Sequence, residues 1–87
     1  MHTLEVTYEW DENKAQINLE KHKIDFAEAA TSLEDEFAIH GRDNDPSEER
    51  FFAIGMDWLG RVLVTAYTWR GDSYRIISSR KPTPRKQ

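Results

Sequence analysis

The 87-residue sequence contains no cysteine, four glycines and three prolines. Without cysteine the fold has no disulfide and no thiolate metal site, so side-chain packing must hold it together. No apolar run approaches the length that spans a membrane, and the start of the chain has no signal-peptide pattern. These absences lead us to expect one small domain that works in the cytoplasm and does not enter a membrane.

The residue patterns that hold metal ions or nucleotides are also missing. The three histidines, His2, His22 and His40, are scattered, and the acidic run at 43–45 lacks the glycine and the distal glutamate of a calcium loop. The glycines stand alone at turn positions, so we find no loop of the kind that cradles phosphates. The sequence therefore predicts no metal and no cofactor.

Charges of opposite sign gather in the two halves of the chain, although the overall charge is only −4. Residues 1–49 hold 14 acidic and four basic side chains, whereas residues 50–87 hold two acidic and eight basic ones. The balance is −10 in the first part and +6 in the second. This asymmetry is typical of a basic working face on an acidic remainder, or of two halves that attract each other in the fold.

The first third of the sequence predicts a short strand and two helices. Residues 6–10 alternate weakly, as an opening strand does. Asp11 offers an N-cap for a helix that continues to His22, where positive charge gathers at the carboxyl end. The run Asp-Phe-Ala-Glu at 25–28 resembles a capping box, and it opens a second helix through Leu33.

The remainder predicts four antiparallel strands, because short turns that contain glycine join its strand-like runs. We expect these strands at residues 36–40, 50–58, 61–69 and 73–81, with a loop at 41–47. The fold class is then α+β, a short strand and two helices followed by a four-stranded meander, with the helices packed on one face of the sheet. Residues 1–81 would form this single domain, and residues 82–87 a disordered tail.

The last expected strand carries the residues with the most specific chemistry. It reads Ser-Tyr-Arg-Ile-Ile-Ser-Ser-Arg-Lys over residues 73–81, and so combines two arginines with three serine hydroxyls. Cations and hydroxyls on a rigid strand suit a phosphate, because an arginine fork matches its oxygens two at a time. An edge strand with solvated arginines would explain the same pattern.

Alternation along this strand sets a condition on its two arginines. On a regular strand Arg75 and Arg80 point to opposite faces, so they cannot reach one phosphate. Either a bulge or the strand end near Ser78 and Ser79 turns Arg80, or only one of the two arginines takes part in catalysis.

Cleavage of RNA without a metal uses the neighbouring 2′-hydroxyl as nucleophile. The protein then supplies a proton carrier and cations for the charge on the phosphorane. His22 and Glu49 are the candidate proton carriers. His22 could equally lie at the edge of the buried face of its helix, and Glu49 could be a solvated residue where a loop enters a strand. The tryptophans could stack on bases, but we expect at least two of them to pack in the core.

Several groups of residues resemble the BrnT toxins, and they occur in the same order. They are Tyr8-Glu-Trp-Asp-Glu-Asn-Lys14, Asn18-Leu-Glu-Lys-His22, Asp25-Phe-Ala-Glu-Ala-Ala30, Glu48-Glu-Arg-Phe-Phe-Ala-Ile-Gly55, Arg61-Val-Leu-Val64 and Arg75-Ile-Ile-Ser-Ser-Arg-Lys81. The resemblance covers nearly the whole chain. It implies a RelE-like fold and a type II toxin–antitoxin system, in which the toxin cleaves RNA without a metal and arrests translation.

The resemblance also implies partners and residue roles. A BrnA-like ribbon-helix-helix antitoxin would neutralise the toxin, and the complex would bind operator DNA through the antitoxin. Arg75 and Arg80 would stabilise transition-state charge, with His22 or Glu49 as the proton carrier. The residues expected to bind RNA are Lys14, Lys21, Arg50, Arg70 and Lys81.

Two other functions fit the same residues. The chain could be a catalytically weak interaction module whose open sheet face mainly binds its antitoxin and contributes to promoter autoregulation. It could also be an RNA-binding domain without cleavage. Growth arrest on expression of the chain alone distinguishes the toxin from the interaction module, and RNA binding at low salt without RNA breakage would favour the RNA-binding domain.

Overall fold

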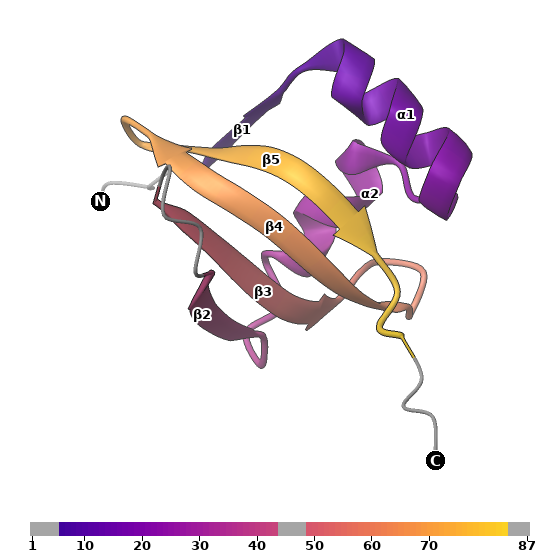
Figure 1. The fold of residues 1–87 in the computed structure, drawn as a ribbon. Coiled ribbons are helices and arrows are strands. Elements are labelled where there is room, and N and C mark those ends of the chain that lie inside the picture. The colour runs from indigo at the N-terminus through magenta and orange to yellow at the C-terminus, as the bar shows by residue number, and fades with distance from the viewer. Residues whose placement is uncertain (1–5, 44–48, 84–87) are drawn as a thin grey trace.

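The computed structural model describes residues 6–43 and 49–83. The elements are β1 (Thr7–Trp10), α1 (Glu12–His22), α2 (Phe26–Ser32), β2 (Ile39–Asp43), β3 (Arg50–Met56), β4 (Val62–Arg70) and β5 (Ser73–Arg80). The five strands form one sheet in the order β1-β5-β4-β3-β2, and both helices lie on the same side of it (Figure 1). This arrangement confirms the expected α+β fold.

Both helices begin at the aspartates that the sequence pointed to. Asp11 Oδ1 accepts hydrogen bonds from the N–H groups of Asn13 at 2.8 Å and Lys14 at 3.2 Å. Asp25 Oδ1 accepts one from the Ala27 N–H at 2.8 Å. A cap of this kind typically stabilises a helix by about 1 kcal/mol. Neither helix is long and apolar enough to cross a membrane, as far as the described residues go.

The opening strand joins the sheet beside the last one. β1 runs parallel to β5, whereas β5, β4, β3 and β2 are antiparallel neighbours. β1 pairs only with residues 73–76, so β5 is covered over its first part and has an open edge over its second. The interpretation of β5 as a simple edge strand is therefore wrong for residues 73–76.

The boundaries of β2 differ from the expected ones. We predicted a strand at 36–40, yet β2 is Ile39–Asp43 and Phe37 lies in the turn before it. The Asp35 carboxylate accepts a hydrogen bond from the Phe37 N–H at 3.0 Å, which favours a turn there. The expected loop at 41–47 starts later, because residues 41–43 pair with β3. Residues 44–47 of that loop and 84–87 of the tail lie outside the described residues.

The core lies between the helices and the sheet. Its main cluster consists of Phe26, Ala30, Leu33, Ala53, Tyr67 and Ile76. Trp10 packs against this cluster, with its ring 6.0 Å from that of Phe26. Trp58 is 82% exposed and Trp69 47%, so the expectation that two tryptophans pack in the core is wrong. Trp58 lies in the β3–β4 turn, and Trp69 lies near the end of β4, where its ring is 4.2 Å from that of Tyr74.

Candidate phosphate-binding site

A β-bulge decides where the side chains of β5 point. Tyr67 pairs with Ile76, whereas its neighbour Ala66 pairs with Ser78, so Ile77 is an extra residue on β5. Such a residue reverses the alternation of the strand that carries it. The bulge lies just before the Ser78–Ser79 segment, and it is one of the alternatives that the sequence left open.

The bulge brings both arginines of β5 to one face. Arg75 lies opposite Thr68 and Arg80 opposite Val64, and these two β4 residues share a face because an even number of positions separates them. The helices cover the other face, which carries the buried Tyr67. We call the uncovered side the open face. Arg75 and Arg80 therefore share a face, although the β4 residues opposite them are four positions apart.

A hollow of about 280 Å³ lies on the open face. It is lined by Asp43, Arg50, Phe52, Val64, Ala66, Ser78 and Arg80. Two arginines and a hydroxyl thus face one space, next to the carboxylate of Asp43. Gly41 lets the Phe52 ring lie across β2, since a Cβ at Gly41 would be 2.5 Å from Phe52 Cζ.

A second hollow, of about 190 Å³, lies where α1 meets β5. It is lined by Lys14, Ile17, Asn18, Lys21, His22, Ile77 and Ser78. The helical residues are spaced by three and four positions, which places them on one face of α1. Ser78 lines both hollows, so cationic side chains of α1 and of the open face lie on either side of one hydroxyl.

A buried carboxamide holds the end of β5. Asn18 is 5% exposed, and its Nδ2 donates to the carbonyls of Ile24 at 3.0 Å and Ser79 at 2.9 Å. Its Oδ1 accepts from the Ser79 N–H at 3.1 Å. Asn18 therefore pairs with β5 as a neighbouring strand would, beyond the point where β1 ends. We missed this residue in the sequence, where a polar side chain between Ala15 and His22 on the buried face of α1 was the available sign.

Hydroxyl groups extend these hydrogen bonds of Asn18 into the core. We call the set from Asn18 through Ser79 to Ser32 the clamp. Ser79 Oγ lies 2.9 Å from Thr65 Oγ1, which lies 3.4 Å from Ser32 Oγ. Ser32 Oγ donates to the Ala29 carbonyl at 2.7 Å. Every buried side-chain nitrogen or oxygen in the described residues has a partner. The bulged end of β5 is thus tied to both helices.

Three further candidates, Arg75, Arg70 and Lys81, line neither of these hollows. Arg75 Nη1 is 3.9 Å from Glu9 Oε1, and Arg70, opposite Ser73, lies on the open face at the far end of β4. Lys81 is exposed just after β5. No three metal-binding side chains gather in residues 6–43 and 49–83.

The Glu49 carboxylate pairs with an arginine of β2 and not with those of β5. Its carboxylate accepts from Arg42 Nη2 at 3.2 Å. Arg42 stands over the ring of Phe51, which stacks on Tyr67 on the helix-covered side. In its place the structure brings Asp43 to the open-face hollow, a residue that we had considered only as a calcium ligand.

Comparison with known proteins identifies the family. The family model described as "Ribonuclease toxin, BrnT, of type II toxin-antitoxin system" matches residues 10–86. The chain belongs to the BrnT toxin family. Membership confirms the resemblance found in the sequence, and with it a ribonuclease toxin whose partner is an antitoxin and whose substrate is RNA.

A solved structure supports the fold. The crystal structure of the Brucella abortus ribonuclease toxin, BrnT, matches with a TM-score of 0.68 over 92% of this chain and 100% of that chain. The two sequences are 24% identical, so this likeness shows the fold of a BrnT toxin and not its residue roles. The curated proteins searched give no match to the chain.

Proposed function

We propose that this BrnT toxin cleaves RNA without a metal ion on the open face of its sheet, in the cytoplasm, and that a BrnA-like ribbon-helix-helix antitoxin neutralises it. The bulge at Ile77 is the observation that supports the site. Because of it, Arg75, Ser78 and Arg80 share a face, and Arg80 lines a hollow together with Arg50. Arginines arranged in this way suit the extra charge of a phosphorane.

Arg80 is the cation at the reacting phosphate. The residues opposite Arg75 and Arg80 are four positions apart on β4, roughly 13 Å at the usual rise of a strand. Arg75 therefore reaches the reacting phosphate only by extending toward Arg80, and otherwise holds the next one. Arg50, Arg70 and Lys81 bind flanking phosphates.

His22 is the favoured proton carrier. In-line attack by a 2′-hydroxyl needs one group that removes its proton and another, on the opposite side of phosphorus, that protonates the leaving 5′-oxygen. His22 lines the α1 hollow and Asp43 the open-face hollow, with Ser78 between them. Lys14 and Lys21 bind the RNA strand as it leaves along α1. Glu49 is a weaker candidate because its carboxylate is paired with Arg42.

Cleavage in the presence of a chelator tests this mechanism. With a synthetic RNA and excess EDTA, the purified toxin should produce fragments ending in a 2′,3′-cyclic phosphate and a 5′-hydroxyl. Arg80→Ala should slow cleavage by about 100-fold, as loss of a transition-state donor does. Arg42→Ala, an exposed arginine on the other face, is the matched control and should cleave at the wild-type rate. Activity that returns only with added Mg²⁺, or equal rates for both variants, would refute the mechanism.

A second candidate function is an interaction module with weak catalysis. Exposed apolar side chains on β2, β3 and β4 favour it, since Ile39 is 64%, Met56 50% and Val62 43% exposed. In either case the antitoxin supplies the contacts to operator DNA. The complex should retard an operator fragment in a gel and the toxin alone should not. Expression of the toxin alone separates the two functions, because only a ribonuclease degrades RNA and stops growth.

A further inference from the structure

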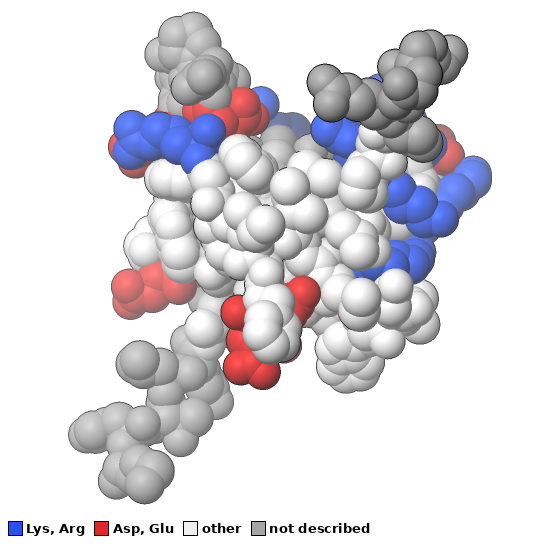
Figure 2. Space-filling view, turned by 90° about the horizontal axis from the view of Figure 1, so that it is seen from below, with Lys and Arg blue, Asp and Glu red and all other residues white. Residues whose placement is uncertain are grey.

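The end of the sheet where the α2–β2 connection meets the β3–β4 turn carries a second surface, separate from the proposed cleavage site. Phe37 is 85% exposed and Trp58 82%, the highest values among large apolar side chains in the described residues. Figure 2 looks onto this end, where an uncharged surface fills the centre and a group of Asp and Glu side chains lies below it. Apolar exposure of this kind on a small protein is typical of a protein interface.

Phe37 and Trp58 line one hollow of about 500 Å³. The other residues that line it are Thr31, Glu34, Asp35, Met56 and Asp57. A hollow of this size between two aromatic rings can accept apolar side chains of a partner. Buried aromatic contacts of this type supply much of the binding free energy in protein interfaces.

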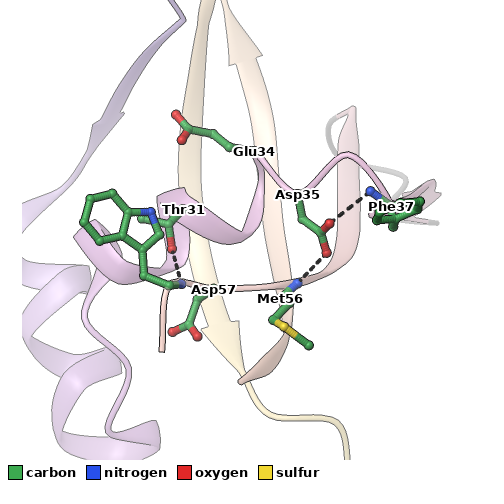
Figure 3. A pocket seen from close by; sticks show the side chains of 7 residues that line it. Thr31, Glu34, Asp35, Phe37, Met56 and Asp57 are labelled. Carbon is green, nitrogen blue, oxygen red and sulfur yellow. Dashed lines mark hydrogen bonds between the residues drawn. The ribbon is translucent and has the colours of Figure 1, made fainter. Parts of the chain in front are cut away.

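Hydrogen bonds hold the backbone of both aromatic residues in place. Thr31 Oγ1 accepts from the Trp58 N–H at 3.0 Å. Asp35 accepts from the Phe37 N–H at 3.0 Å and from the Met56 N–H at 2.9 Å, as the dashed lines in Figure 3 show. A backbone that is already ordered loses little entropy on binding, so more of the contact energy becomes affinity.

The rim of the hollow is acidic. Glu34, Asp35 and Glu36 follow one another, the first two line the hollow, and no Lys or Arg of the described residues does. Hydrogen bonds from the Met56 and Phe37 N–H groups favour the ionised form of Asp35 and hold its pKa below the usual value. A partner with basic side chains is complementary to this rim.

Apolar side chains lead from the hollow to the proposed cleavage site. Met56, at the hollow, lies opposite Val62 on the open face. The next pair on that face is Ile54 and Val64, and Val64 lies opposite Arg80 and lines its hollow. A chain bound at Phe37 and Trp58 can therefore continue along this strip and cover Arg80.

We propose that Phe37, Trp58 and the acidic rim anchor a cationic amphipathic segment of the antitoxin. The apolar side of the segment covers the two rings, and its Lys or Arg side chains lie over Glu34 and Asp35. From this anchor the antitoxin extends over the strip and excludes RNA from Arg80. The inference rests on the proposed function, since it takes the antitoxin as the partner that blocks the site.

Serine variants at Phe37 and Trp58, with Trp69→Ser as the control, test the anchor. Phe37→Ser and Trp58→Ser toxins should stop growth and cleave RNA as the wild type does, but co-expressed antitoxin should no longer restore growth. The affinity of each purified variant for the antitoxin should fall at least tenfold, as expected for loss of a central aromatic contact. Trp69→Ser, which removes an exposed tryptophan at the other end of β4, should bind the antitoxin like the wild type. Thermal melting of each variant controls for folding.

A synthetic helical peptide tests the chemistry of the partner. A peptide with leucines on one side and lysines on the other should compete with the antitoxin for the wild-type toxin and not for Trp58→Ser. The same peptide with glutamates in place of lysines, or serines in place of leucines, should not compete.

Three results would overturn the anchor. They are unchanged antitoxin affinity in Phe37→Ser and Trp58→Ser, equal competition by the glutamate peptide, and self-association of the toxin that depends on these two residues. Failure of the proposed function looks different. A wild-type toxin that cleaves no RNA but still loses antitoxin affinity on Phe37→Ser would refute the ribonuclease and leave the anchor in place.

Discussion

Replacement of Asn18 by leucine should loosen the end of β5. Leucine has a similar size and shape, but it cannot make the three hydrogen bonds of the buried carboxamide with Ser79 and Ile24. Each buried polar group that loses its partner costs about 1–3 kcal/mol. With three such groups and some relaxation of the backbone, we expect a loss of about 3 kcal/mol from the free energy of unfolding.

This loss is a large part of the stability of a domain of this size, for which about 5–15 kcal/mol is usual. Since 1 kcal/mol lowers the midpoint of a small domain by about 4–8 °C, the melting temperature of Asn18→Leu should fall by about 15 °C. Circular dichroism measures the midpoint, and amide hydrogen exchange locates the effect. Exchange should accelerate at residues 78–80 before it does at 74–76, which pair with strands on both sides.

Asn13→Leu provides the matched control, because Asn13 is exposed in the first turn of the same helix. It should stay within about 0.5 kcal/mol of the wild type, as surface substitutions usually do. A melting temperature for Asn18→Leu close to that of Asn13→Leu would refute the clamp. So would uniform acceleration of exchange along β5, since that would indicate a general loss of packing.

Two further predictions concern charged groups, the Asp57–Arg61 pair and Lys21. Burial opposes ionisation of Asp57, but hydrogen bonds from Arg61, at 2.6 Å and 2.9 Å from its Oδ2, hold the pKa of Asp57 below its usual value. The pair therefore stabilises the fold above about pH 4 and loses this effect as the pH falls through the lowered pKa. Arg61→Met should cost about 3 kcal/mol at pH 7 and less at acid pH, measured by urea unfolding across pH, and an equal loss at both would contradict the pairing. Lys21→Ala should reduce the slope of log affinity for single-stranded RNA against log salt by about 0.7, the value for one phosphate contact, whereas Lys23→Ala, outside the α1 hollow, should leave the slope unchanged.

Local features of the fold could be predicted from the sequence, because their causes are local. Asp11 and Asp25 cap the helices that they were expected to cap, and the turns at Gly60 and Gly71 adopt the positive φ that glycine allows. The parallel pairing of β1 with β5 could not be predicted in this way. It joins residues 7 and 73, and nothing in either segment specifies the other. The pairing of residues 41–43 with β3 also depends on a segment outside their own stretch of sequence.

The same difference between local and distant causes applies to the residues of the candidate site. The arginines and serines of β5 could be proposed from the sequence, because their chemistry suits a phosphate wherever the strand lies. Asn18 and Asp43 were missed, because what they do depends on the backbone of β5 and on Arg50 across the sheet. Phe37 was expected in the strand at 36–40 and Trp58 at the end of the strand at 50–58, with at least two of the three tryptophans in the core. The turns in which they lie expose them instead.

The bulge and the clamp both act on the end of β5, where Arg80 and the Ser79 backbone would otherwise be buried without partners. With Ile76 in the core, a regular strand would direct Arg80 to the helix-covered side, where an unpaired guanidinium costs several kcal/mol. The extra residue Ile77 turns Arg80 to the open face instead. The same segment has no β1 beside it, so the Ser79 N–H and carbonyl would face the interior without partners if Asn18 did not bind them. Asn18 thus holds the end of β5 that carries Arg80, and loss of Asn18 should impair RNA cleavage through Arg80.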